Sequence, residues 1–110
     1  MTDGIYHVRF SAGHGQIGEG LAVIKNGKVN GGDPGYLYTG TMIQAGVTAT
    51  SQLHIKQWNP RVQSVFGPLK AFDLALAGSV TADGFTVNGS ITGQPGQRIQ
   101  ITGKFISTAA

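Results

Sequence analysis

The sequence of 110 residues contains no cysteine, which excludes a disulfide framework and any thiol chemistry. Only 12% of the residues are charged, about half the usual share of a soluble protein. No apolar run comes near the roughly 18 residues that a membrane span needs. The N-terminus, MTDGIYHVRF, has neither the basic nor the apolar segment of a signal peptide. These absences predict a cytoplasmic protein without a membrane partner.

The sequence also lacks the patterns that mark catalytic, metal and nucleic-acid sites. Its eight basic residues are scattered and never adjacent, so we expect a solvated surface and no direct nucleic-acid binding. The three histidines have no metal-ligand spacing, and we expect no metal and no cofactor. GHGQIG (13–18) matches a dinucleotide-binding pattern, but a strand-like segment follows where a helix is required. No nucleophile motif is present and the carboxylates are far apart in sequence, so we expect no enzyme.

What the sequence does contain is the alternation of apolar and polar residues that is typical of β-strands. It is clearest in VTATSQLHIKQW (47–58), where the alternate residues from Val47 to Ile55 share one face. Turn signals such as Asn26-Gly27 and Asp83-Gly84 separate the alternating segments. The sequence therefore predicts one long connection, at 59–68, and eight strands, at about 3–11, 18–25, 28–33, 36–44, 47–58, 69–80, 84–92 and 97–106.

Four of these strands carry a glycine at the same relative place, within YLYTGTM, LALAGSV, FTVNGSI and IQITGKF. The glycines share a face with the large apolar residues; they are Gly40, Gly78, Gly89 and Gly103. A glycine on the inner face lets a strand coil sharply, which a small closed barrel requires. Short turns imply antiparallel neighbours in up-and-down order. We therefore predict an all-β, single-domain fold over residues 1–110: an eight-stranded up-and-down antiparallel β-barrel of the lipocalin or calycin type.

Two regions of such a barrel can carry function. The first is the interior, in which strand parity places six aromatic residues: Tyr6, Phe10, Tyr36, Tyr38, Phe72 and Phe85. An eight-stranded barrel is either filled by side chains or holds one small ligand, and the bulk of the aromatic rings favours a filled core. The second region is WNPRVQSVFG (58–67), which is too apolar for a plain connection because of Trp58, Val62, Val65 and Phe66. It either covers one end of the barrel or meets a partner.

The chain contains DGIYHVRF (3–10), GEGLAVIKNGKVNGGDPGYLYTG (18–40) and IKQWNPRVQSVFG (55–67). Together these stretches resemble the GrlR-like family of negative regulators of bacterial type III secretion, and the similarity runs in order over nearly the whole chain. The resemblance implies a lipocalin-like barrel that dimerises, in agreement with the fold predicted from the residues. It also implies repression of virulence genes by binding a helix-turn-helix transcriptional activator, and not by binding DNA.

One segment departs from the family pattern. The best-known members carry alternating Glu and Asp at the turn after the fourth strand, and the resemblance implicates this acidic run in binding the activator. The equivalent residues here contain no carboxylate; they are Ile43, Gln44, Ala45, Gly46 and Val47. We expect these residues and the apolar ones of 58–67 to be the partner-binding residues, but the identity of the partner does not follow.

The sequence thus predicts a non-enzymatic regulator that acts through protein–protein contact. The alternative is a carrier or sensor that binds a small apolar ligand inside the barrel. A homodimer is expected from the resemblance. Strand parity also places large apolar residues on the outer face, which favours self-association; they are Ile5, Ile24, Leu37 and Ile43.

Overall fold

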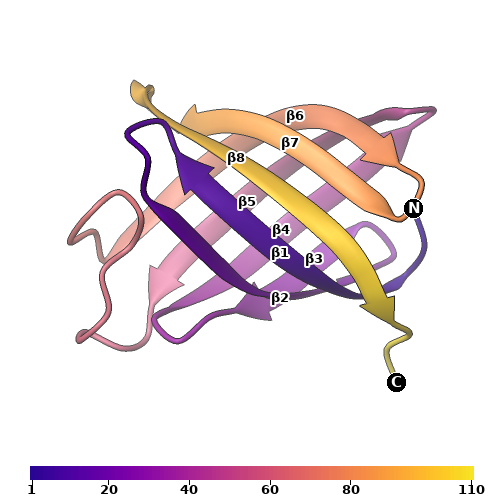
Figure 1. Ribbon diagram of the computed structural model, residues 1–110, viewed down its shortest axis with the longest axis horizontal. Coiled ribbons are helices and arrows are strands. Elements are labelled where there is room, and N and C mark those ends of the chain that lie inside the picture. Colours follow the sequence, from indigo (N-terminus) through magenta and orange to yellow (C-terminus); the bar gives the residue numbers. More distant parts are fainter.

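The computed structural model in Figure 1 describes residues 1–110 as eight strands without a helix. The strands are β1 (Gly4–Ala12), β2 (Ile17–Lys25), β3 (Lys28–Gly32), β4 (Tyr36–Ala45), β5 (Thr48–Gln57), β6 (Ala71–Thr81), β7 (Gly84–Ile91) and β8 (Gln94–Ser107). Each strand pairs antiparallel with the next one, and β8 pairs with β1, so the sheet closes into an up-and-down barrel. The predicted fold class is confirmed. The largest error in a strand end is at the start of β8, which begins at 94 and not at 97.

The alternation in β5 shows how the sequence builds the wall of the barrel. Successive side chains of a strand point to opposite faces, and in β5 every second residue is buried. The one polar residue on this inner face is Ser51, whose hydroxyl donates a hydrogen bond of 2.6 Å to the carbonyl oxygen of Thr41. The prediction that Val47 shares this face is wrong, because Val47 lies in the β4–β5 turn, before the strand begins, and is 73% exposed.

The repeated glycines lie at inward positions, as predicted. Gly89, for example, pairs with the inward residues Leu76 and Ile99. A Cβ atom at Gly89 would lie 1.9 Å from the carbonyl oxygen of Ala75, and the same close approach to a neighbouring strand occurs at Gly40 and Gly78. These three glycines therefore permit the close approach of adjacent strands, and the backbone of the next strand limits their size. At Gly103 the interior sets the limit, because a Cβ atom there would lie 2.2 Å from the ring of Phe85.

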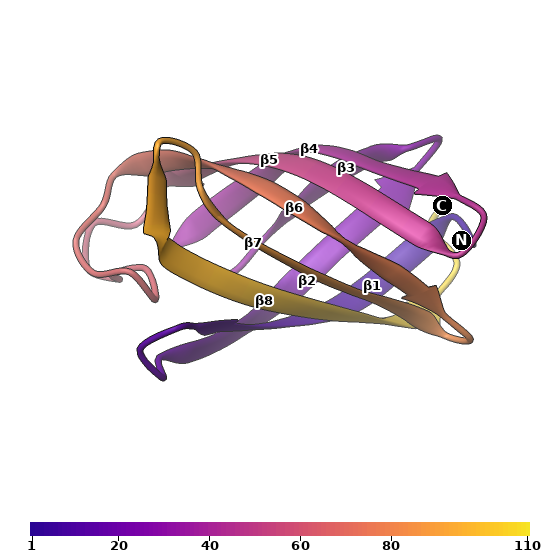
Figure 2. The ribbon, with the colours of Figure 1, turned by 90° about the horizontal axis from the view of Figure 1, so that it is seen from above.

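The connections divide between two ends of the barrel (Figures 1 and 2). One end carries the β2–β3, β4–β5 and β6–β7 turns and both termini. The other end carries the β1–β2, β3–β4 and β7–β8 connections and the long segment 58–70 between β5 and β6. We call the first the terminal end and the second the loop end. At the terminal end the β2–β3 turn has positive φ at both Asn26 and Gly27, as the predicted type I′ turn requires.

The outer face does not contain all of the apolar residues that strand parity placed there. Leu37 and Ile43 are about half exposed, at 48% and 51%. Ile24 is only 4% exposed and points into the barrel, so its predicted outward position is wrong. β2 carries apolar residues on both faces, with Leu21 outside and Ala22 inside. The alternation of residue types in β2 therefore does not predict which of its two faces is buried.

Candidate functional site

The interior of the barrel holds a cavity of about 360 Å³. Twenty of its 26 lining residues are hydrophobic. The lining includes Ile17, Pro34 and Val62, which lie at the loop end, so the cavity opens there. The expectation of a filled core is therefore wrong. The small inward residue Ala22 contributes little volume to the lining, whereas the ring of Phe10 occupies the space at Gly18, 2.4 Å from where a Cβ atom would lie.

Five of the six aromatic residues predicted in the interior line this cavity; they are Phe10, Tyr36, Tyr38, Phe72 and Phe85. Tyr6 is buried, at 1% exposure, but it closes the terminal end of the barrel and is not part of the cavity lining. Its ring packs against Phe85 and Phe105 with centroid distances of 5.7 and 5.6 Å. Its hydroxyl donates to the carbonyl oxygen of Thr2, and burial, with a smaller effect of Asp3, raises the pKa of this hydroxyl.

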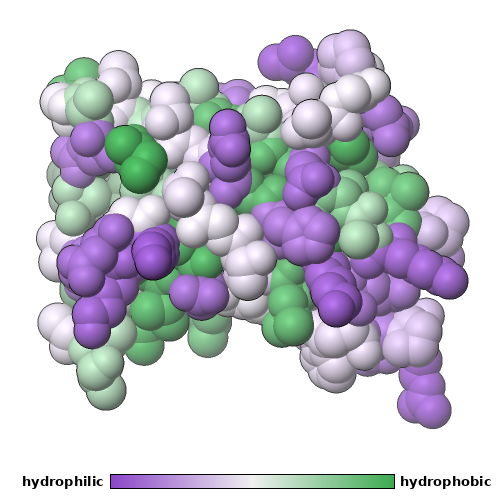
Figure 3. Space-filling view, turned by 180° about the vertical axis from the view of Figure 1, so that it is seen from behind, coloured by the Kyte–Doolittle hydropathy of each residue, from purple (hydrophilic) through white to green (hydrophobic).

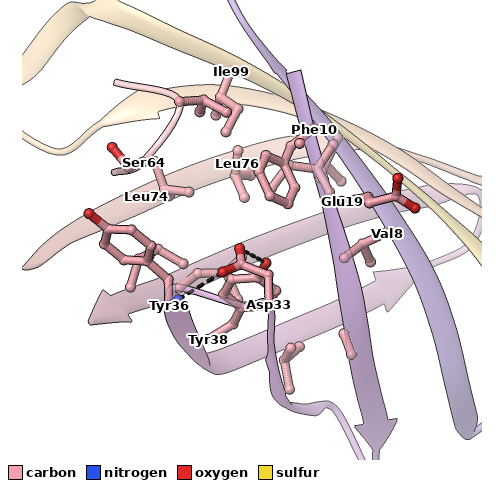
Figure 4. A pocket seen from close by; sticks show the side chains of 18 of the residues that line it. Val8, Phe10, Glu19, Asp33, Tyr36, Tyr38, Ser64, Leu74, Leu76 and Ile99 are labelled. Carbon is pink, nitrogen blue, oxygen red and sulfur yellow. Dashed lines mark hydrogen bonds between the residues drawn. The ribbon is translucent and has the colours of Figure 1, made fainter. Parts of the chain in front are cut away.

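A carboxylate is fixed at the mouth of the cavity (Figure 4). Asp33 begins the β3–β4 connection, whose turn sequence is Asp-Pro-Gly, and its Oδ1 accepts hydrogen bonds of 2.8 Å from the backbone N–H groups of Gly35 and Tyr36. Its Oδ2 accepts a hydrogen bond from the Tyr38 hydroxyl. Burial, together with the hydrogen bond and negative charge of Asp33, raises the pKa of Tyr38 well above its usual range. Tyr38 therefore keeps its proton and stays a donor.

The long connection between β5 and β6 lies over part of the mouth. Val62 and Val65 line the cavity, and the ring of Phe66 packs edge-on against Phe72 at a centroid distance of 5.5 Å. Trp58 is 54% exposed, and its indole N–H donates a hydrogen bond of 3.0 Å to the carbonyl oxygen of Asp33. Of the two alternatives for this segment, its contacts match the covering of one barrel end.

The predicted partner-binding residues fall into two separate groups. The β4–β5 turn lies at the terminal end, and there Ile43 and Val47 are exposed at 51% and 73%. The side-chain oxygen of Gln44 accepts a hydrogen bond from the N-terminal ammonium group, and its amide donates to the carbonyl oxygen of Gly46 at 2.9 Å. The residues of 58–67 lie at the loop end (Figure 1). The two groups therefore cannot form one continuous surface.

Sequence reasoning missed the role of Asp33 and Glu19, the two charged residues that line the cavity. It treated Asp33 only as a turn residue. The signal that identifies Asp33 is its place in the Asp-Pro-Gly turn that leads into Tyr36 and Tyr38, the two inward tyrosines at the start of β4. Glu19 borders the cavity from an exposed position of β2, and its carboxylate pairs with His7 on the outer face.

Two of the three histidines pair with exposed carboxylates. His7 lies 2.7 Å from Glu19, and His54 lies 2.8 Å from Asp73. No group of three side chains of the metal-binding types comes together anywhere in the chain. The chain also has no helix that is long and apolar enough to cross a membrane.

No curated protein matches the chain. A family match, in contrast, covers it almost from end to end: residues 1–109 match GrlR, described as a negative regulator of the type III secretion system. The matched range includes all eight strands and the cavity that they enclose. The chain belongs to the GrlR family of negative regulators of type III secretion.

Proposed function

We propose that this chain is a non-enzymatic regulator that acts in the cytoplasm by binding a protein partner, a transcriptional activator of the helix-turn-helix class. The family supplies the regulatory role. We assign the contact to the β4–β5 turn, residues 43–47. The observation that supports this assignment is the exposure of Ile43 and Val47, two apolar side chains that the fold leaves uncovered at 51% and 73%. Exposed apolar groups of this kind are typical of contact sites.

The chemistry of the turn indicates what kind of contact it makes. Residues 43–47 carry no charged side chain, so steering by charge cannot come from them. Electrostatic complementarity mainly sets the association rate and the choice of partner, while buried apolar anchors supply most of the affinity. The turn therefore favours an apolar contact, and its partner need not be the one that binds an acidic run at the same place.

A pair of matched variants tests this assignment. Val47 and Ile17 are both 73% exposed, but they lie at opposite ends of the barrel. The assay is isothermal titration with the purified helix-turn-helix activator that is encoded nearest to the gene of this chain. Val47→Asp should weaken binding by about tenfold or more, while Ile17→Asp should bind like the wild type. Loss of binding in Ile17→Asp alone would move the contact to the loop end.

The cavity favours a second function, the binding of a small apolar ligand. Its volume of about 360 Å³ falls within the range of about 300–1,000 Å³ that is typical of small-molecule sites, and most of its lining is apolar. Native mass spectrometry of the freshly purified protein tests this function, with a co-purifying mass as the expected result. An Ala22→Phe variant should lose that mass, because Ala22 lines the cavity and a larger side chain there would fill it.

A further inference from the structure

The polar side chains at the mouth of the cavity mainly accept hydrogen bonds, and the donors among its tyrosine and serine hydroxyls are already paired. From this arrangement we propose that the cavity selects a ligand whose apolar body ends in a hydrogen-bond-donating head, such as a long-chain alcohol or amine, and discriminates against long-chain carboxylates. This inference rests on the second function proposed above, the binding of a ligand inside the barrel.

The charge of the lining is of one sign. Glu19 and Asp33 are the only charged residues among the 26 that line the cavity, and none of the eight lysines and arginines is among them. The Asp33 carboxylate stands at the mouth, where the head of a ligand with its apolar body inside would lie (Figure 4), whereas the Glu19 carboxylate lies on the outer face of β2, 2.7 Å from His7 Nε2. A second carboxylate at this place would meet like charge without a basic partner in the lining.

The donors of the lining are already in use. The Tyr38 hydroxyl donates to Asp33, the Tyr36 hydroxyl donates to the carbonyl oxygen of Leu69, and the Ser64 hydroxyl donates to the carbonyl oxygen of Gly67. The backbone N–H groups of Gly35 and Tyr36 both donate to Asp33. The amide of Gln63 is the only side-chain donor of the lining without an acceptor in the chain, and the backbone N–H groups of Gln63 and Val65 are unpaired as well. An anionic head therefore finds unpaired donors only on the segment between β5 and β6, whereas a donor head finds the lone pairs of Asp33 Oδ2 and of the Tyr38 hydroxyl, next to the one carboxylate at the mouth.

The acceptor is held in place before any ligand binds. Three donors fix the Asp33 carboxylate, and charge-assisted hydrogen bonds of this kind are among the strongest in proteins. β2 also packs closely against the pair, because a Cβ atom at Gly20 would lie 2.6 Å from the Tyr38 hydroxyl oxygen and 3.2 Å from Cβ of Asp33. A preorganised acceptor gains affinity for a donor head and cannot turn away from an anionic one.

The test compares three ligands with the same twelve-carbon chain: dodecanol, dodecylamine and dodecanoate. Each displaces the neutral fluorescent probe N-phenyl-naphthylamine from the full-length protein at neutral pH, below its micelle-forming concentration. We expect the alcohol and the amine to displace the probe at concentrations about tenfold or more below that of dodecanoate. The negative charge of Asp33 repels the carboxylate of dodecanoate, and the oxygens of that carboxylate find few hydrogen-bond donors at the mouth. Equal or tighter binding of dodecanoate would overturn the proposal while leaving ligand binding in the barrel intact.

Two charge-neutralising variants locate the effect. Asp33→Asn keeps an oxygen that accepts from the two backbone N–H groups but removes the charge at the mouth, and it should reduce the preference for amine over carboxylate several-fold. Asp73→Asn removes the same charge from an exposed position on the outer face and should leave the preference unchanged. An unchanged preference in Asp33→Asn would overturn the proposed role of Asp33. Failure of the probe to bind at all, or equal probe binding by Ala22→Phe, would overturn the ligand-binding function itself.

Discussion

The hydroxyl of Tyr38 donates a hydrogen bond to the carboxylate of Asp33, and this contact joins the inner face of β4 to the connection that precedes it. Because the pair is partly buried and the acceptor is negatively charged, the pKa of Tyr38 is raised above its ordinary value of 10.0. The folded state therefore keeps a proton that the unfolded state loses above pH 10.0. The stability that this group contributes is complete below pH 10.0 and is lost as the pH rises beyond it.

The first prediction is that the free energy of unfolding falls steeply above about pH 10, and that Tyr38→Phe makes this fall shallower. At neutral pH the same variant should be less stable by about 1–3 kcal/mol, because the Asp33 carboxylate loses a donor. Urea unfolding at a series of pH values measures both effects. Tyr6 has a raised pKa as well, so the double variant with Tyr6→Phe should show the shallowest fall. A wild-type slope in both variants would contradict the assignment.

The second prediction concerns the repeated glycines. Gly89→Val should cost several times the ~1 kcal/mol of a typical substitution, since even its Cβ atom would lie 1.9 Å from the backbone oxygen of Ala75. Gly96 is the matched control: it lies in β8, and a Cβ atom there meets no atom within 4 Å. Thermal melting should show a large loss for Gly89→Val and a small change for Gly96→Val. If Gly89→Val melts within a few degrees of the wild type, the close strand approach is not what requires glycine.

Most of the wall of this barrel could be predicted from the sequence, because a period of two residues and short turns fix antiparallel neighbours. The exception is β2, where Leu21 and Ala22 put apolar residues on both faces and leave the parity of Ile24 undetermined. The separation of residues 43–47 from 58–67 also follows from the sequence, since successive connections of an up-and-down barrel alternate between its ends. The cavity does not follow from the sequence, because strand parity alone does not separate Tyr6, which packs against Phe85 and Phe105 outside the lining, from the five other inward aromatic residues, which line the cavity.

The third prediction is a homodimer. Leu21, Gly32 and Leu37 are register neighbours on the outside of β2, β3 and β4. Leu21 and Leu37 are 50% and 48% exposed, and Figure 3 shows hydrophobic residues exposed between hydrophilic ones on the outer surface. We expect a second copy of the chain to cover this strip, because an exposed apolar face of this kind is typical of an interface.

Light scattering after size exclusion at micromolar concentration should give twice the chain mass of 11.4 kDa. Leu37→Asp should shift the mass toward the monomer. Ile106→Asp, at a position 53% exposed on β8, adds the same charge away from the strip and should remain dimeric. A wild-type mass near 11.4 kDa would rule out the dimer.

The last prediction concerns the salt dependence of partner binding. Because residues 43–47 carry no charge, the affinity for the activator should change by less than about threefold between low and high salt. Placing acidic residues in the turn, with Gln44→Glu and Ala45→Asp, should make the association rate salt-dependent, since charge near a contact acts mainly on the rate of encounter. The control, Gln100→Glu with Thr102→Asp, adds the same charges to exposed positions of β8. Surface plasmon resonance at several salt concentrations separates the two rates. If wild-type binding collapses with added salt, charged residues outside 43–47 make the contact, and the apolar turn is not the binding surface.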